Sequence, residues 1–147
     1  ALGNAGIIWI ILAAVLLCIP RYRRCGAVLA AGLLAGLVFG NLLIKPLIHR
    51  PRPCWLYEVQ LITKIPSDYS FPSGHTYSSF TAAFLLLRYD GRLGIRALDV
   101  SLLIAFSRMY LYAHFPTDVL GGIVLAAAIS AAVTAIDKRI ETKEGVK

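Results

Sequence analysis

Two histidines and an aspartate have the types and spacing needed for chemistry at phosphorus. His75 ends the run 72–75 (Pro-Ser-Gly-His), and His114 lies four residues before Asp118. One neutral imidazole can attack a phosphorus atom while a second imidazole protonates the leaving oxygen. A carboxylate at this spacing can hold the other ring nitrogen of the attacking imidazole, as in a His–Asp catalytic pair. We therefore predict His114 as the nucleophile, His75 as the general acid and Asp118 as the residue that orients His114.

Three cations, Lys45, Arg52 and Arg108, accompany these histidines in an otherwise apolar sequence. Arg side chains bind phosphate oxygens through paired hydrogen bonds, Lys adds a point charge, and together they can neutralise a phosphoryl transition state. Ser73 is a residue type that caps a helix N-terminus, and Gly74 leaves backbone N–H groups open to an anion. These five residues are the predicted phosphate-binding set, and its three charged members are named the cation cluster.

Hydrophobic blocks are the elements that must position these residues. The 147-residue chain is 58% hydrophobic and 16% charged, whereas soluble domains are about a quarter charged, and its mean hydropathy is +0.70. Each block approaches the ~20 residues that a helix needs to cross a bilayer. We therefore predict an all-α, polytopic bundle of transmembrane helices that forms a single membrane-embedded domain over residues 1–147. The predicted spans are residues 2–19, 25–44, 75–87, 95–112 and 116–136.

The distribution of positive charge predicts the topology. Ten of the 15 Lys and Arg residues lie in 21–24, 88–96 and 138–147, which alternating spans place on one side of the membrane. The positive-inside rule makes this side cytoplasmic. The C-terminus is then cytoplasmic, and the net charge of +7 is explained without nucleic acid. The other ends of the spans meet at the non-cytoplasmic face, which brings the predicted site together there.

Three motifs, taken together, resemble the signature of the PAP2 (type 2 phosphatidic acid phosphatase) superfamily. They are Lys45 with Arg52-Pro53, the run 72–75, and Ser107-Arg108 with His114 and Asp118. The resemblance implies a helical core like that of vanadium haloperoxidases and a phosphatase that forms a phosphohistidine without metal or cofactor. It implies the same roles for both histidines, Asp118 and the phosphate-binding set. Membrane members usually have six spans, so five visible blocks predict a further helix before Ala1.

The resemblance leads us to expect a lipid phosphatase of the plasma or inner membrane, with membrane lipids as its partners. Its substrate would be undecaprenyl diphosphate, phosphatidylglycerol phosphate or phosphatidate, and the compact size favours the polyprenyl carrier. A phosphohistidine also permits transfer to an acceptor other than water. A non-catalytic lipid-phosphate binder is a third reading, but binding alone would need only the cations. The sequence leaves the oligomeric state open.

Some polar residues have an alternative reading. The two catalytic histidines and Asp118 would also make a Zn²⁺ ligand set, although three adjacent cations disfavour a divalent metal. For Arg50 the sequence leaves two roles possible, a contact to phosphate or an anchor for a lipid headgroup. His49 is expected to be structural.

The connection 46–71 is long for so compact a chain. Its acidic residues Glu58 and Asp68 are predicted to be solvated loop charges. Its aromatic residues, including Trp55 and Tyr69, are predicted to lie at the membrane interface.

Two groups of glycines have two possible explanations, close helix packing or the general tolerance of Gly in membrane helices. One group lies at four-residue spacing in the second block, and the other is a pair in the fifth. They are Gly32, Gly36 and Gly40, and Gly121 and Gly122.

Overall fold

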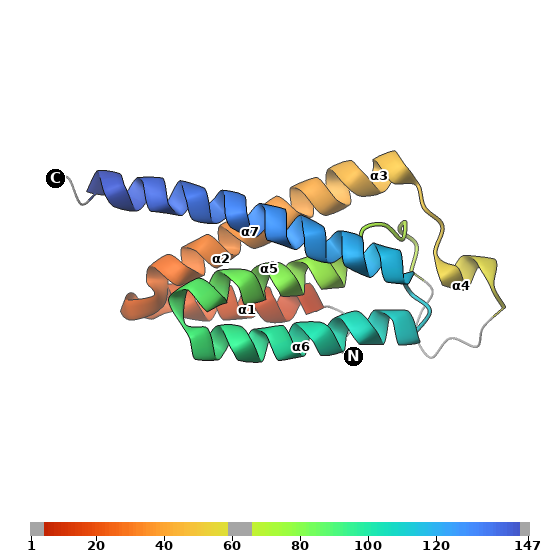
Figure 1. The fold of residues 1–147 in the computed structure, drawn as a ribbon, viewed down its shortest axis with the longest axis horizontal. Coiled ribbons are helices and arrows are strands. Elements are labelled where there is room, and N and C mark those ends of the chain that lie inside the picture. The colour runs from red at the N-terminus through yellow and green to blue at the C-terminus, as the bar shows by residue number, and fades with distance from the viewer. Residues whose placement is uncertain (1–4, 59–65, 145–147) are drawn as a thin grey trace.

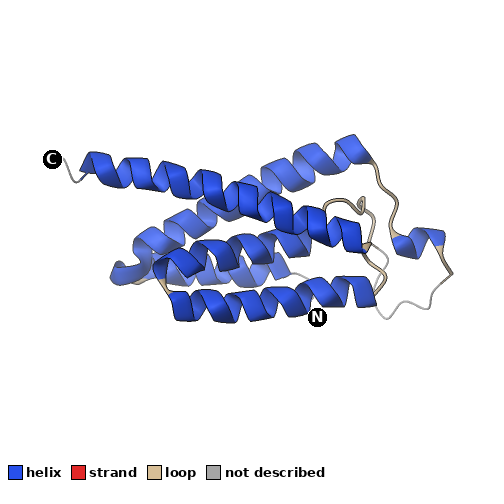
Figure 2. Cartoon of the chain, viewed as in Figure 1, coloured by secondary structure: helices blue, strands red, loops and turns tan. Residues whose placement is uncertain are grey.

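Figures 1 and 2 show the computed structural model, which describes residues 5–58 and 66–144. Within these residues the chain forms helices and connections, with no strand. The elements are α1 (Ala5–Cys18), the 3₁₀ turn η1 (Pro20–Tyr22), α2 (Arg23–Gly36), the π-helical η2 (Leu37–Ile44), α3 (Lys45–Ile48), α4 (Pro53–Leu56), α5 (Gly74–Tyr89), α6 (Gly91–Tyr110) and α7 (Pro116–Glu144). The predicted all-α fold is confirmed, and every predicted span coincides with a helical segment; residues 2–4 of the first lie outside the described part.

Two boundaries differ from the predicted ones for local reasons. The second span continues past residue 44 through η2 into α3, where the N–H of Lys45 donates to the carbonyl of Gly40. This five-residue step is the hydrogen bond of a π-turn, a feature found often at functional sites. The fourth span begins at Gly91 instead of residue 95, because the carboxylate of Asp90 accepts two backbone N–H groups and caps α6.

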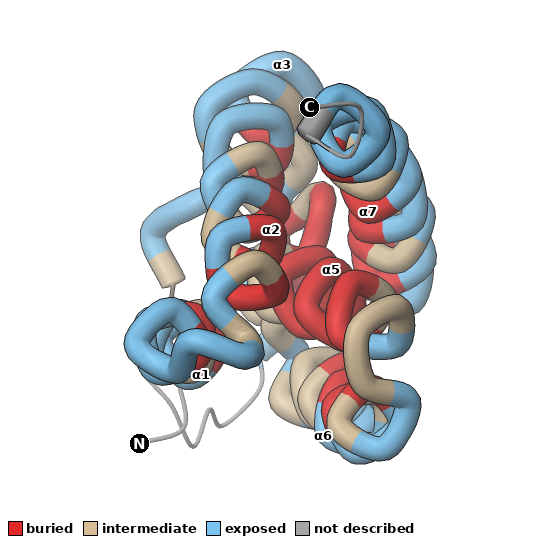
Figure 3. Tube along the Cα trace, turned by 90° about the vertical axis from the view of Figure 1, so that its left-hand side faces the viewer, coloured by how far each residue is buried: buried red, intermediate tan, exposed pale blue. Residues whose placement is uncertain are grey.

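Helix α5 lies at the centre of the bundle, with α1, α2, α6 and α7 around it (Figure 3). Its residues 76–83 are all buried, and most of them are Ser, Thr or Ala. Small side chains allow helices to approach one another closely. Trp9 of α1 and Leu29 of α2 pack against one side of α5, and Val119 and Ala126 of α7 pack against another.

The glycines in α2 and η2 are sites of close approach to α5. A Cβ atom added to Gly32 would lie 2.6 Å from Cδ1 of Leu85, and one added to Gly40 would lie 2.5 Å from Cε1 of Tyr77. In α7, a Cβ atom on Gly122 would lie 3.1 Å from the carbonyl oxygen of Ser73. Close packing is therefore the correct reading of these glycines.

The outward surface of the bundle is apolar, as a lipid environment requires. Leu103 and Val124 are each 70% exposed, and Phe106 is 63% exposed. Two helical segments, Pro20–Leu56 and Pro116–Lys143, are long and apolar enough to cross a membrane. Large exposed apolar surfaces on helices of this length are typical of integral membrane proteins.

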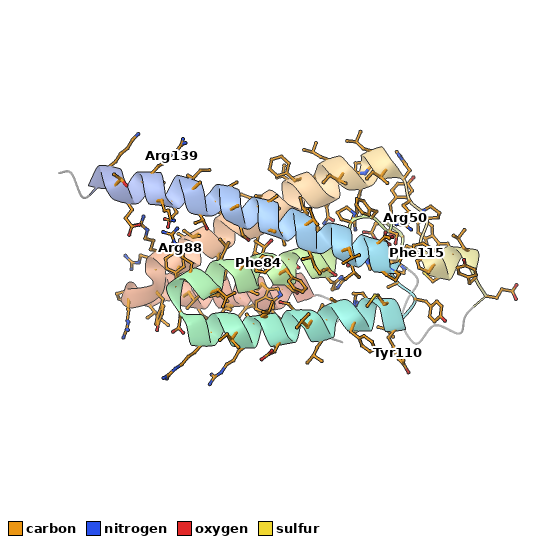
Figure 4. All side chains as sticks on the ribbon, in the orientation of Figure 1. Arg50, Phe84, Arg88, Tyr110, Phe115 and Arg139 are labelled. Carbon is orange, nitrogen blue, oxygen red and sulfur yellow. The ribbon has the colours of Figure 1, made fainter. Side chains whose placement is uncertain are left out.

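Ion pairs join α2, α5 and α7 at the end of the bundle that carries Arg88 and Arg139 in Figure 4. Asp137 of α7 lies 2.9 Å from Nε of Arg24 and 3.1 Å from Nη2 of Arg88. The hydroxyl of Tyr89 also donates to this carboxylate at 2.6 Å. Cations expected from the sequence to mark the cytoplasmic side thus also hold three helices together.

Candidate active site

The predicted site residues gather at the opposite end of the bundle, where Figure 4 labels Arg50 and Phe115. Helices α5 and α7 begin there, α6 ends there, and the connection from α3 to α4 crosses it (Figure 1). Lys45 opens α3, Arg52 precedes α4, and Arg108 lies in the last turn of α6. The carbonyl of Arg108 accepts the N–H of His114 at 3.2 Å, which fixes the turn between α6 and α7.

Arg52 contacts the predicted nucleophile directly. Its buried guanidinium places Nη1 3.1 Å from Nε2 of His114 and donates from the same nitrogen to the carbonyl of Ala113 at 2.8 Å. A guanidinium has no acceptor atom, so Nε2 must be the acceptor and the ring proton resides on Nδ1. His114 therefore directs a nitrogen lone pair toward the cation cluster.

Burial, reinforced by the positive charge of Arg52, lowers the pKa of His114, and the neighbouring Asp118 offsets part of this effect. The folded protein therefore holds His114 as a neutral imidazole at neutral pH. A neutral ring is the form that can act as a nucleophile.

Asp118 lies on the other side of the His114 ring and is completely buried. Its Oδ2 is 3.8 Å from Nδ1 of His114, which is too long for a hydrogen bond. The same oxygen accepts the backbone N–H of Phe115 at 2.8 Å and the hydroxyl of Ser70. Asp118 is thus beside the ring, as predicted from the spacing, but its hydrogen bonds come from other donors.

Ser70 is a site residue that sequence reasoning missed. Its Oγ lies 3.4 Å from Nδ1 of His114 and donates to Asp118, so it bridges the ring and the carboxylate. Its backbone N–H donates to the carbonyl of Arg50 at 2.9 Å. The one available signal was its position just before the run 72–75.

Arg50 is bonded to Asp118, a partner that neither of its two sequence readings included. Its Nη1 donates to Oδ1 of Asp118 at 2.8 Å and to Oγ1 of Thr117 at 2.6 Å. Its guanidinium also lies 4.4 Å from the centroid of the Phe115 ring. Arg50 therefore balances the charge of the buried carboxylate that faces His114.

The start of α5 contributes to the site in a different way from that expected. Ser73 is at the N-cap position, but its hydroxyl makes no capping bond and accepts from Thr76 at 2.9 Å. The predicted N-cap position is therefore confirmed, but the expected capping hydrogen bond from its side chain is absent. A Cβ atom on Gly74 would lie 3.9 Å from Nζ of Lys45, so the N-terminus of α5 adjoins a cation. His75 follows in the first turn and is half-buried.

Asp68 was predicted to be a solvated loop charge, and its side chain is indeed exposed, but it also forms two ion pairs that the prediction did not include. Its two carboxylate oxygens contact Lys45 and Arg52, the latter at 2.6 Å. Burial opposes ionisation of Asp68, but the hydrogen bonds and charges of Lys45 and Arg52 outweigh it and lower its pKa. Because Lys45 and Arg52 are buried, solvent screens their charges little, and both attract this loop carboxylate.

A pocket of about 530 Å³ opens beside Lys45 and Asp68. Trp55 and Tyr69, expected at the membrane interface, contribute to its wall, and their rings lie 6.3 Å apart in an edge-to-face arrangement. His49 packs on Tyr69 at 4.6 Å, in keeping with its expected structural role. In the described part of the chain, no group of three or more His, Cys, Asp or Glu side chains could hold a metal ion.

Comparison with known proteins identifies the family. Residues 25–141 match the PAP2 superfamily. An undecaprenyl-diphosphatase of Sulfolobus acidocaldarius is 32% identical over 125 residues, which are 84% of this chain and 60% of the relative. A decaprenylphosphoryl-5-phosphoribose phosphatase of Mycobacterium tuberculosis is 36% identical over 137 residues, which are 91% of this chain and 74% of the relative. The chain therefore spans less than two thirds of the archaeal relative's length.

A solved structure is similar over nearly the whole chain. The crystal structure of a transmembrane PAP2-type phosphatidylglycerolphosphate phosphatase from Bacillus subtilis matches with a TM-score of 0.72 and 26% identity, covering 95% of this chain and 72% of that one. Together with the two long apolar helices, this similarity indicates an integral membrane protein. The family match includes all three motifs, and the chain belongs to the PAP2 superfamily.

Proposed function

We propose that this protein is a membrane lipid phosphatase that works through a phosphohistidine on His114. The observation that carries the proposal is the environment of the His114 ring. Its Nε2 lies 3.1 Å from a buried guanidinium, and its Nδ1 faces the Asp118 carboxylate at 3.8 Å. A neutral imidazole with its lone pair beside cations, and its proton beside a carboxylate, is suited to attack a phosphate ester.

In the first step, the Nε2 lone pair of His114 forms a bond to the terminal phosphorus as the bond from that phosphorus to the leaving oxygen breaks. The leaving oxygen belongs to the lipid alcohol in a monophosphate and to the lipid phosphate in a diphosphate. His75 gives its proton to that oxygen, and the lipid leaves. Nδ1 keeps its proton, and Asp118 stabilises the positive ring. Before the reaction Arg52 donates a hydrogen bond to Nε2. Once Nε2 is bonded to phosphorus, Arg52 donates to a phosphoryl oxygen instead, and Lys45 and Arg108 neutralise the remaining charge.

In the second step, water attacks phosphorus and the bond from nitrogen to phosphorus breaks. His75, now neutral, accepts a proton from this water. The products are inorganic phosphate and the original neutral His114. An acceptor alcohol in place of water would make the protein a phosphotransferase.

A polyprenyl phosphate or diphosphate is the proposed substrate, with phosphatidylglycerol phosphate as the second candidate. Support comes from two relatives named for undecaprenyl and decaprenyl substrates and one named for phosphatidylglycerol phosphate. We further propose that the site faces the non-cytoplasmic side and that the C-terminus is cytoplasmic. Charge distribution supports this orientation.

The test compares the parent protein with His114→Ala in detergent containing EDTA, with undecaprenyl diphosphate as substrate and phosphate release as readout. His49→Ala serves as the matched control, because it removes a loop histidine that packs on Tyr69 instead of Arg52. We expect activity in the parent and the control and none in His114→Ala. Equal activity in all three would remove His114 as nucleophile, and loss of parent activity in EDTA would refute the metal-free mechanism.

A second measurement separates hydrolysis from transfer and from binding alone. Equal amounts of lipid product and inorganic phosphate indicate a hydrolase, whereas a deficit of inorganic phosphate with an added alcohol indicates a phosphotransferase. A protein that binds undecaprenyl diphosphate but releases no product from either candidate lipid would be the non-catalytic carrier.

A further inference from the structure

Asp68 is bound where a phosphoryl group would be expected to bind. It presents two carboxylate oxygens to two members of the cation cluster, one to Lys45 and one to Nη2 of Arg52. Two oxygens of a phosphate can accept from the same two donors, Lys45 and Nη2 of Arg52, in charge-assisted hydrogen bonds. Both cations are nearly inaccessible to solvent, with side-chain exposures of 8% and 5%, so they have few other directions in which to bind an anion.

The Asp68 side chain can leave this position while its backbone stays in place. Its carboxylate side chain is 54% exposed, so solvent is available to receive it. Its carbonyl accepts Nε of Arg52 at 2.7 Å independently of the carboxylate. The flanking backbone is anchored on both sides: the carbonyl of Pro66 accepts the indole N–H of Trp55, and Ser70 donates to Arg50. Rotation of one side chain is therefore sufficient to free Lys45 and one Arg52 nitrogen.

We infer that Asp68 is an internal competitor for the phosphate-binding site, a carboxylate that any phosphate ligand must displace. The inference rests on the proposed phosphate site and adds a residue that sets its affinity. Competition within the chain reduces the fraction of sites ready to bind, and so raises the dissociation constant of every anion by the same factor. Weakly bound anions are thereby excluded at ordinary concentrations, and the released inorganic phosphate leaves more readily.

The alternative is that Asp68 positions Lys45 and Arg52 and stays bound to them when phosphate enters. The two roles predict opposite results for Asp68→Asn, which keeps the size of the side chain and removes its charge. Displacement predicts tighter phosphate binding in the variant, because a competitor has been removed. Positioning predicts weaker binding, because the cations lose their support.

The experiment is calorimetric titration of the full chain in detergent with inorganic phosphate, which needs no turnover. Glu58→Gln is the matched control: it removes the same charge from an exposed position of the same connection, and no ion pair joins Glu58 to the cation cluster among the described residues. We expect the dissociation constant for phosphate to fall about tenfold in Asp68→Asn and to stay at the parental value in Glu58→Gln. Asp68→Ser provides a second variant should Asp68→Asn fail to fold, with the same expected direction.

Unchanged or weaker phosphate binding in a folded Asp68 variant would overturn the inference and leave the proposed function intact. An equal gain in Glu58→Gln would also overturn it, because the effect would then be one of net charge. If the parent and all variants fail to bind phosphate, the proposed phosphate site itself is wrong, and the inference fails with it.

Discussion

Asp118→Asn tests whether the buried carboxylate acts on His114 through its charge. When His114 attacks phosphorus its ring becomes positive, and Oδ2 of Asp118 lies 3.8 Å from Nδ1. At the effective dielectric constant of about 20 that suits such sites, two unit charges at this distance attract by about 4 kcal/mol. Arg50 shares the carboxylate at 2.8 Å and reduces this attraction. We take about 3 kcal/mol as the stabilisation of the transition state, which corresponds to a loss of about 100-fold in kcat.

The assay is the rate of phosphate release from undecaprenyl diphosphate at saturating substrate, in the same detergent for each protein. Asp99→Asn is the control, because it removes an exposed carboxylate from α6 without touching the site. Thermal unfolding must show that Asp118→Asn is folded, since the substitution leaves Arg50 without its charged partner. A folded Asp118→Asn with kcat within threefold of the parent would refute the electrostatic argument, and Asp118 would then be a purely structural residue.

Two further predictions concern pH and packing. Since burial lowers the pKa of His114, the acid limb of kcat/KM, which reports protonation of this ring, should lie below the ordinary value of about 6.5. Arg50→Gln should move this acid limb to higher pH, because the Asp118 carboxylate would then act on the ring unopposed. An acid limb above pH 6.5 in the parent would contradict the assignment of that limb to His114. Gly40→Ala should destabilise the fold by about 1–3 kcal/mol, because the new Cβ would lie 2.5 Å from the Tyr77 ring, whereas Gly91→Ala, with nothing within 4 Å, should not. Thermal unfolding of both variants in detergent checks this, and equal midpoints would disprove the close contact.

The helices were predictable because each depends on a long stretch of sequence. An apolar block of about 20 residues has few stable arrangements besides a membrane-spanning helix. Spans of known order then bring the ends of distant helices together, so Lys45, Arg108 and His114 could be assigned to one end without any structural detail. The boundaries were less predictable because single local hydrogen bonds, such as the Asp90 cap on α6, decide them.

The partners of the site residues were not predictable, because they come from a connection without periodicity. Ser70 and Asp68 are bound to the site through the path of the backbone between α4 and α5, and nothing in the spacing of polar residues encodes that path. An aspartate in a loop is usually exposed and bound only to water. Asp68 also forms ion pairs, because two buried cations lie within reach of its carboxylate.

Burial distinguishes the two carboxylates of the site and explains why the same chemical group would serve opposite purposes. Asp118 is fully buried and accepts hydrogen bonds from Ser70, Phe115 and Arg50, so its displacement would leave several donors unsatisfied. Asp68 is half exposed, and water can replace its contacts when the side chain rotates. The fixed charge of Asp118, beside Nδ1 of His114, stabilises the positive ring in the transition state. The movable charge of Asp68 instead occupies Lys45 and Arg52 until a phosphate, which carries more charge, displaces it. The combined variant Asp68→Asn/Asp118→Asn should therefore bind inorganic phosphate more tightly than the parent and turn over lipid more slowly. If affinity and kcat instead both fell or both rose, the two carboxylates would act as one unit.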